Sequence, residues 1–303
     1  MSKERILYLV GFLLISSAYL ITSIWLQSRG FFNPESYFIE YKTQILLRFD
    51  TGFLRTFYFT RPALLFLLAL PFSLLFTIHG TFILNAILIG LLTNHLISKG
   101  LKGDRDQKIY IVYLLLSPVI LYAGVSGGSL ALYLAFYFLF FNLLLKYNSS
   151  QSVYHLTLLS LLLGAHVLMD AQFVKLILLL IPVFFFVGFY KTKGISGNFY
   201  YRASVIFKNS SQRRKFFTGF LSAVMVVSFI PGMSFLIYLV INKVFAGEYF
   251  FFQTSVGDSY SSYSQLFPLI NSGEELWNGI SSPSLTFIVA TAFLSPLLVY
   301  KLF

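Results

Sequence analysis

Charged residues are scarce in this chain, and cysteine is absent altogether. Only 11% of the 303 residues are charged and 57% are hydrophobic, whereas about a quarter of the residues in a soluble domain are charged. So few charges cannot cover a water-facing surface, so we expect lipid to cover much of the protein. The lack of cysteine excludes disulfides, thiolate metal sites and a cysteine nucleophile, and the four histidines are too scattered for a histidine-rich metal cluster.

Long apolar runs predict an all-α fold, a polytopic transmembrane helix bundle that forms one integral membrane domain over residues 1–303. A span needs about 20 apolar residues, which gives about eight candidates here. They are residues 6–26, 81–98, 109–123, 130–145, 153–168, 173–190, 216–241 and 285–302. We interpret the first as a retained helix rather than a cleaved signal peptide, because no small-residue cleavage site follows it.

Basic residues set the predicted orientation of the bundle. The net charge is +11, and basic segments occur at 99–108, around Lys146 and at 191–215. The positive-inside rule places all three in the cytoplasm only if the apolar run 62–78 does not cross the membrane. We therefore predict that this run is a re-entrant or membrane-surface helix on the outer side. The rule explains the basic balance, so membrane lipid is the expected partner and nucleic acid is not.

Two long external loops follow from this topology, residues 27–80 and residues 245–284, with both chain termini in the cytoplasm. Seven of the chain's 11 acidic residues lie in these loops. Such an orientation suits the inner membrane of a bacterium. A functional site would then face the extracytoplasmic side.

The first external loop opens with a segment that we expect to be an interfacial helix, residues 34–47. Tyr37 and Tyr41 belong to its apolar face, and Glu35 lies at its positive N-terminal end. Glu35 or Glu40 is a candidate metal ligand or general base. The alternatives are a helix-start charge for Glu35 and a solvated charge for Glu40.

A compact group of charges follows in the same loop, with Asp50 among Arg48, Arg55 and Arg61. Asp50 is a candidate base or cation ligand. The planar guanidinium groups suit bidentate binding of a phosphate or pyrophosphate. The alternative is an interfacial ion pair with arginines that anchor lipid headgroups. If a divalent cation such as Mg²⁺ or Mn²⁺ binds, Glu35 and Asp50 are its candidate ligands.

A second polar cluster, composed of His166, Asp170, Gln172 and Lys175, lies at the predicted outer ends of two spans. His166 and Asp170 are four residues apart and would share one face if both were helical. The cluster could line a cavity under the outer surface. The alternative is a helix-end pair, with Lys175 extending its amine toward the headgroups.

The order of features over residues 1–190 resembles the GT-C superfamily of glycosyltransferases, which use lipid-linked sugars. In that pattern a first span precedes a long external loop with an early acidic residue, and three spans with short connectors follow a Pro-led apolar stretch. The matching pieces are Pro34-Glu35-Ser36-Tyr37, Arg61-Pro62, residues 85–90, Leu116-Ser117-Pro118, Gly127-Gly128-Ser129 and Met169-Asp170.

The resemblance implies a polyprenyl-phosphate- or polyprenyl-pyrophosphate-linked sugar donor. It also implies a first-loop acid that deprotonates the acceptor or binds a divalent cation, with Glu35 the first candidate and Asp50 the second. The chain departs from the pattern at Ser129, where many relatives have a second acid, and we expect no soluble C-terminal domain. Both departures leave open a scaffold without catalysis, or a divergent polymerase of lipid-linked repeats.

The sequence thus predicts an inverting transferase for the assembly of cell-envelope glycans or glycoconjugates. In this hypothesis Arg48, Arg55 or Arg61 stabilises the leaving lipid phosphate. A second hypothesis is a non-catalytic subunit of an envelope or secretion complex that docks protein partners through the aromatic loop 245–284. A third is a transporter or flippase, which the near absence of charges within the spans disfavours.

Overall fold

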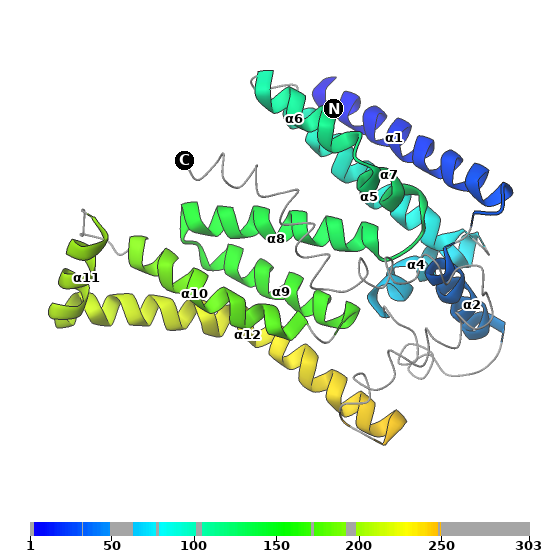
Figure 1. The fold of residues 1–303 in the computed structure, drawn as a ribbon. Coiled ribbons are helices and arrows are strands. Elements are labelled where there is room, and N and C mark those ends of the chain that lie inside the picture. The colour runs from blue at the N-terminus through cyan, green and yellow to red at the C-terminus, as the bar shows by residue number, and fades with distance from the viewer. Residues whose placement is uncertain are drawn as a thin grey trace. The chain divides into compact units, whose positions relative to one another are not determined.

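The computed structural model of the protein describes residues 3–31, 33–48, 63–76, 79–100, 105–170, 173–191, 198–247 and 249. Within these ranges the regular elements are helices, and no strand occurs. The helices are α1 (Lys3–Ser28), α2 (Pro34–Arg48), α4 (Ala63–Leu75), α5 (Gly80–Gly100), α6 (Arg105–Leu115), α7 (Pro118–Val125), α8 (Leu130–Ser150), α9 (Val153–Met169), α10 (Val174–Lys191), α11 (Phe199–Lys208) and α12 (Ser210–Ala246) (Figure 1).

Four helices in the described part of the chain are long and apolar enough to cross a membrane, over Arg5–Ser28, Gly80–Gly100, Leu130–Ser150 and Ser210–Phe245. Each contains one of the predicted spans. Three shorter apolar helices are Ala63–Leu75, Val153–Met169 and Leu176–Lys191. The all-helical class and the membrane-type helices are confirmed, while the count of about eight spans stays a prediction. The predicted span 285–302 lies outside the described residues.

The predicted span 109–123 is not one helix in the structure but two, α6 and α7. Ser117 separates them with extended backbone, at φ −60° and ψ 128°, and Pro118 begins α7. Proline disfavours helical backbone in the residue before it and cannot donate to the preceding turn. A continuous helix through residues 116–118 is therefore excluded.

The apolar run 62–78 contains helix α4, which has 13 residues and Pro71 inside it. At 1.5 Å per residue this helix is about 20 Å long, shorter than the roughly 30 Å hydrocarbon core. Its length agrees with a helix that does not cross the membrane. Its depth and orientation in the membrane stay predictions.

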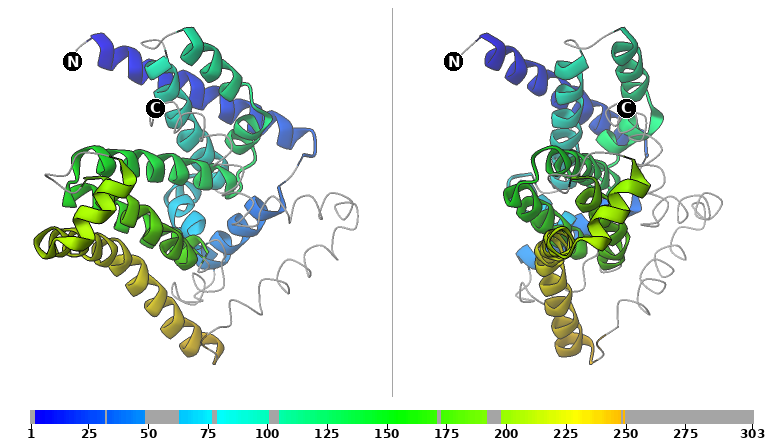
Figure 2. Two further views of the ribbon diagram at one scale, coloured as in Figure 1. Left: turned by 60° about the vertical axis from the view of Figure 1, so that its left-hand side comes forward. Right: turned by 90° about the vertical axis from the view of Figure 1, so that its left-hand side faces the viewer.

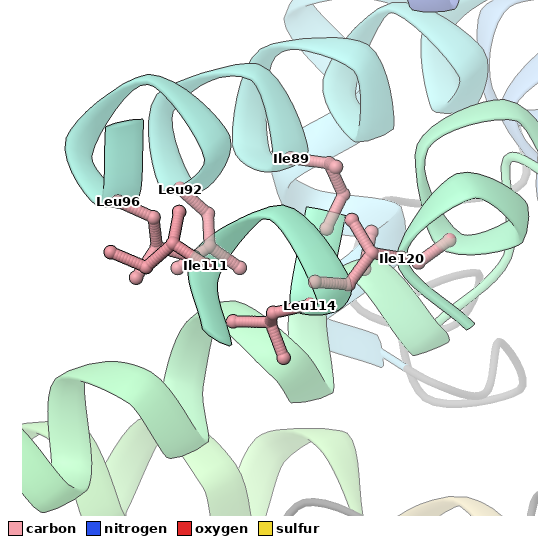
Figure 3. Close-up of a cluster of buried hydrophobic side chains, with 8 residues drawn as sticks. Ile89, Leu92, Leu96, Ile111, Leu114 and Ile120 are labelled. Atoms are coloured by element: carbon pink, nitrogen blue, oxygen red, sulfur yellow. The ribbon is translucent and has the colours of Figure 1, made fainter. Parts of the chain in front are cut away.

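The chain divides into two compact units, and the boundary falls inside α8, between Phe138 and Leu139. In the first unit α1 packs along α5, and α5 also contacts α4, α6 and α7 (Figure 1). A core cluster joins α5, α6 and α7, with side chains of α5 facing those of α6 and α7 (Figure 3). Its labelled members are Ile89, Leu92, Leu96, Ile111, Leu114 and Ile120.

The second unit comprises the rest of α8, helices α9 to α11, and α12 as far as Val244. One of its cores joins Phe189 of α10, Ile206 of α11 and Phe216 of α12, each nearly inaccessible to solvent. This cluster holds the short helix α11 against the end of α10 and the beginning of α12. Both views of Figure 2 show α11 at the N-terminal end of α12, at a steep angle to it.

Candidate functional site

Helix α2 positions the candidate acid Glu35 in its first turn. Asn33 precedes the helix, and its Oδ1 accepts a hydrogen bond of 3.0 Å from the backbone N–H of Glu35. Asparagine is among the best residues for satisfying the free N–H groups at a helix start, and the fixed φ of Pro34 suits the first helical position. The local sequence Asn33-Pro34-Glu35 therefore fixes where α2 begins and where the Glu35 side chain emerges.

The Glu35 carboxyl group meets the turn that connects α7 to α8. Its Oε2 accepts a 2.9 Å hydrogen bond from the backbone N–H of Ser129, the residue before α8. Gly127 in this turn has φ +70°, a left-handed conformation that glycine adopts without strain. A methyl group on Gly128 would clash with Asn33 Nδ2 and lie 2.7 Å from Glu35 Oε2. A residue larger than glycine would thus displace these two side chains from the turn.

The same turn is held from its other side by Asn85 of α5. Its side-chain Nδ2 donates hydrogen bonds to the backbone oxygens of Ala123, at 3.1 Å, and Gly128, at 2.9 Å. The Asn85 side chain is fully buried, so these bonds form where water does not compete. Asn85 and Glu35 together make the Gly127-Gly128-Ser129 turn a fixed structure between α2 and α5.

The environment of Glu35 changes its acidity. The residue is half-buried, and neighbouring protein atoms desolvate its carboxyl group. Burial raises the pKa of Glu35 above its ordinary value, and hydrogen bonds from the backbone and side chain of Ser129 lower it in part. Desolvation penalises the charged form of a carboxyl group. Glu35 is thus a stronger base, when ionised, than a glutamate in water.

We expect the raised pKa to make the stability of the protein depend on pH. An acid whose pKa is higher in the folded than in the unfolded chain contributes stability that is fully present below the unfolded pKa and lost as pH rises through the folded pKa. Over that window the wild type should lose stability relative to Glu35→Gln. Unfolding titrations of both proteins in mixed micelles at stepped pH measure this difference, and a constant difference would contradict the assigned environment.

A second carboxyl group of α2, that of Glu40, anchors the helix to its neighbours. Its Oε1 accepts a 2.7 Å hydrogen bond from the backbone N–H of Thr81, in the first turn of α5, and its Oε2 accepts one of 2.9 Å from Ser73 Oγ of α4. Glu40 is 3% exposed. The prediction of a solvated charge at Glu40 is therefore wrong, because the first turn of α5 offers an unpaired N–H group and a positive dipole end.

The face of α2 that packs against the protein is not the face predicted to be apolar and to lie at the membrane interface. It consists of Ser36, Ile39, Glu40 and Thr43, whereas Tyr41 is 57% exposed. Within the described part of the chain, Ser36 and Thr43 turn inward without partners from other helices, because their hydroxyl groups donate to the backbone oxygens of Asn33 and Ile39. Of these residues, only Glu40 takes its partners from neighbouring helices. The exposed Tyr41 suits an aromatic position at a membrane–water interface.

The structure locates only one of the four residues in the predicted group of charges. Arg48 is the last residue of α2 and is exposed. Asp50, Arg55 and Arg61 lie outside the described residues, so the phosphate-binding prediction is not tested. In the described part of the chain no group of three potential ligands of the His, Asp or Glu type surrounds Glu35 or any other position. Cation binding by Glu35 and Asp50 stays a prediction.

The secondary polar cluster belongs to the other compact unit. The His166 side chain is fully buried, with Nδ1 3.0 Å from the backbone oxygen of Leu162 and the ring 5.0 Å from that of Phe173. Helix α9 ends at Met169, and Asp170 has extended backbone at φ −149° and ψ 123°. His166 and Asp170 therefore do not share a helical face. Gln172 and the Lys175 side chain lie outside the described part of the chain.

Comparison with protein families, curated proteins and solved structures gave no match to this chain.

Proposed function

We propose that the chain is a membrane-embedded glycosyltransferase of the GT-C type, with about eight spans and both termini in the cytoplasm of a bacterium. It transfers a sugar from a polyprenyl-phosphate-linked donor at the extracytoplasmic face. One observation carries the proposal. The first-loop acid Glu35 is fixed against the Gly127-Gly128-Ser129 turn, where its surroundings raise the pKa of its carboxyl group.

The proposed reaction uses Glu35 as the general base. A hydroxyl oxygen of the acceptor attacks the anomeric carbon of the donor, and its proton passes to the Glu35 carboxylate. The bond from the anomeric carbon to the phosphate oxygen breaks, and the lipid phosphate leaves with the electron pair. The configuration inverts because the hydroxyl oxygen attacks from the side opposite the phosphate. A carboxyl group with a raised pKa suits this role, because general bases work best when their pKa is near the operating pH.

Arginines of the first loop are the candidates for stabilising the negative charge on the leaving phosphate. Arg48 is exposed at the end of α2, and Arg55 and Arg61 follow in the same loop. In the alternative role for the first-loop acids, Glu35 and Asp50 would hold a divalent cation, which would supply a positive charge to the phosphate.

The transfer assay uses membranes that contain the full chain, supplied with a panel of radiolabelled polyprenyl-phosphate hexoses and pentoses. We expect Glu35→Gln to lower transfer on the order of a hundredfold, since a general base contributes at least this much. The amide oxygen of glutamine can still accept the Ser129 N–H bond. Asp106→Asn, the matched carboxyl-to-amide change in the basic segment 99–108, should leave transfer unchanged. Full transfer by a folded Glu35→Gln protein would refute the assigned role.

A non-catalytic membrane subunit is the second candidate function. It is favoured by the hydrogen bonds of Glu35 and Glu40, because each carboxyl group accepts an N–H group at a helix start, Ser129 before α8 and Thr81 in α5. These two bonds would give Glu35 and Glu40 a purely structural role. Purification in mild detergent separates the two functions: stable partner proteins without transfer from any donor in the panel support the subunit.

A further inference from the structure

The short helix α11 turns aromatic side chains outward. Tyr200 is 82% exposed, Tyr201 57% and Phe207 46%. The opposite face of the helix holds Ile206, which is fully buried with Phe189 and Phe216. The helix start is also fixed, because Asn198 Oδ1 accepts a 3.1 Å hydrogen bond from the Tyr201 N–H. The outward aromatic side chains therefore belong to an anchored helix.

The segment that contains α11 is strongly basic. The stretch 191–215 has seven basic residues and no acidic one, namely Lys191, Lys193, Arg202, Lys208, Arg213, Arg214 and Lys215. Arg202 is engaged within the unit, where it donates to the Tyr190 oxygen at 2.8 Å. Lys208 at the end of α11, and Arg213, Arg214 and Lys215 in the first turns of α12, are exposed. The exposed aromatic side chains of α11 are thus followed along the chain by exposed basic side chains at the start of α12, and the cluster of Phe189, Ile206 and Phe216 holds the two helices together.

The position of this surface along the chain indicates what it contacts. It adjoins the start of α12, one of the helices long and apolar enough to cross a membrane. Tyrosine side chains favour the membrane–water interface, where the ring is in an apolar layer and the hydroxyl group is hydrated. Basic residues next to a span are attracted by anionic headgroups. An acidic protein partner would also be attracted by the basic residues. It would not, however, provide the apolar layer that the three aromatic side chains favour, whereas the bilayer crossed by the adjoining span does.

We propose that α11 and the first turns of α12 form a membrane-surface anchor that binds anionic phospholipid headgroups. Tyr200, Tyr201 and Phe207 enter the interfacial layer of the bilayer, while Arg213, Arg214 and Lys215 contact the phosphates. The helix lies along the membrane surface in the manner of an interfacial helix. This surface contains none of the residues of the proposed transferase site, and its test does not depend on catalytic activity.

The absence of cysteine allows a clean test, because a single introduced cysteine is the only thiol in the chain. The full-length protein is spin-labelled at Tyr200→Cys and placed in nanodiscs of phosphatidylcholine, or of an equal mixture with phosphatidylglycerol. Collision rates with oxygen and with a water-soluble nickel chelate report whether the label is in lipid or in water. The control label is Ser149→Cys, at an exposed position in the last turn of α8.

We expect the label at position 200 to collide mainly with oxygen in the mixed nanodiscs. The label at position 149 should collide mainly with the nickel chelate in both kinds of nanodisc. Each basic residue near an anionic surface changes binding by about fivefold. Changing Arg213, Arg214 and Lys215 to Gln should therefore raise nickel access at position 200 at least fivefold in the mixed nanodiscs. Equal nickel access at positions 200 and 149, or equal burial of the position 200 label with and without phosphatidylglycerol, would overturn the proposal.

Discussion

Replacing Glu40 by alanine should destabilise the first unit by about 4 kcal/mol. The change removes the acceptor of two buried hydrogen bonds, those from Thr81 N–H and Ser73 Oγ. A buried donor left without a partner costs about 1–3 kcal/mol, and the missing side-chain volume adds a cavity between α2, α4 and α5. The free energy of unfolding, measured by titration with a denaturing detergent in mixed micelles, checks this value.

Two further variants separate the hydrogen bonds of Glu40 from general effects on α2. Glu40→Gln keeps one oxygen acceptor, so it should lose no more than half of the stability that Glu40→Ala loses. Tyr41→Ala, next to Glu40 but 57% exposed, should change the free energy of unfolding by less than about 0.5 kcal/mol. A loss below 1 kcal/mol for Glu40→Ala, on the order of an ordinary surface change, would show that the carboxyl group does not anchor α2.

The all-helical class follows from composition and run length, because apolar runs of about 20 residues suit no other regular structure in lipid. The break at Ser117 could also have been predicted from the sequence, since Ser117-Pro118 contains the signal for a helix boundary. The prediction of a single span there rested on the length of the apolar run alone. The hydropathy of residues 109–123 stays high throughout, although the helical backbone is interrupted at Ser117.

The two acids of α2 show where sequence reasoning stops. Glu35 is recognisable because it directly follows Asn33-Pro34, a local signal for a helix start. The partners of Glu40 are 33 and 41 residues away along the chain, and nothing within α2 indicates them. The small inward residues Ser36 and Thr43, spaced with Glu40 by one helical turn, are the one local sign that a closely packed neighbour covers this face.

The junction of α4 with α5 should be equally intolerant of added volume, so Gly80→Ala is expected to cost about 3 kcal/mol. A methyl group on Gly80 would clash with Ser73 Oγ and lie 2.6 Å from the backbone N and 2.9 Å from the Cα of Ser73. A side chain can rotate away from such a contact, but the backbone atoms of α4 cannot. Relief requires the two helices to move apart. The detergent unfolding titration used for Glu40→Ala measures the loss.

Gly219→Ala in α12 is the matched control, because nothing lies within 4 Å of the added methyl group. Alanine favours a helix interior over glycine by about 1 kcal/mol, so this variant should be neutral or stabilised. Ser73 links the Gly80 contact to Glu40, since its Oγ donates to the Glu40 carboxyl group. Moving α4 away from Gly80 breaks that bond, so the losses from Gly80→Ala and Glu40→Ala should not add. A double variant whose loss equals the sum of the single losses would show that the two contacts are independent. The junction of α2, α4 and α5 would then not act as one unit.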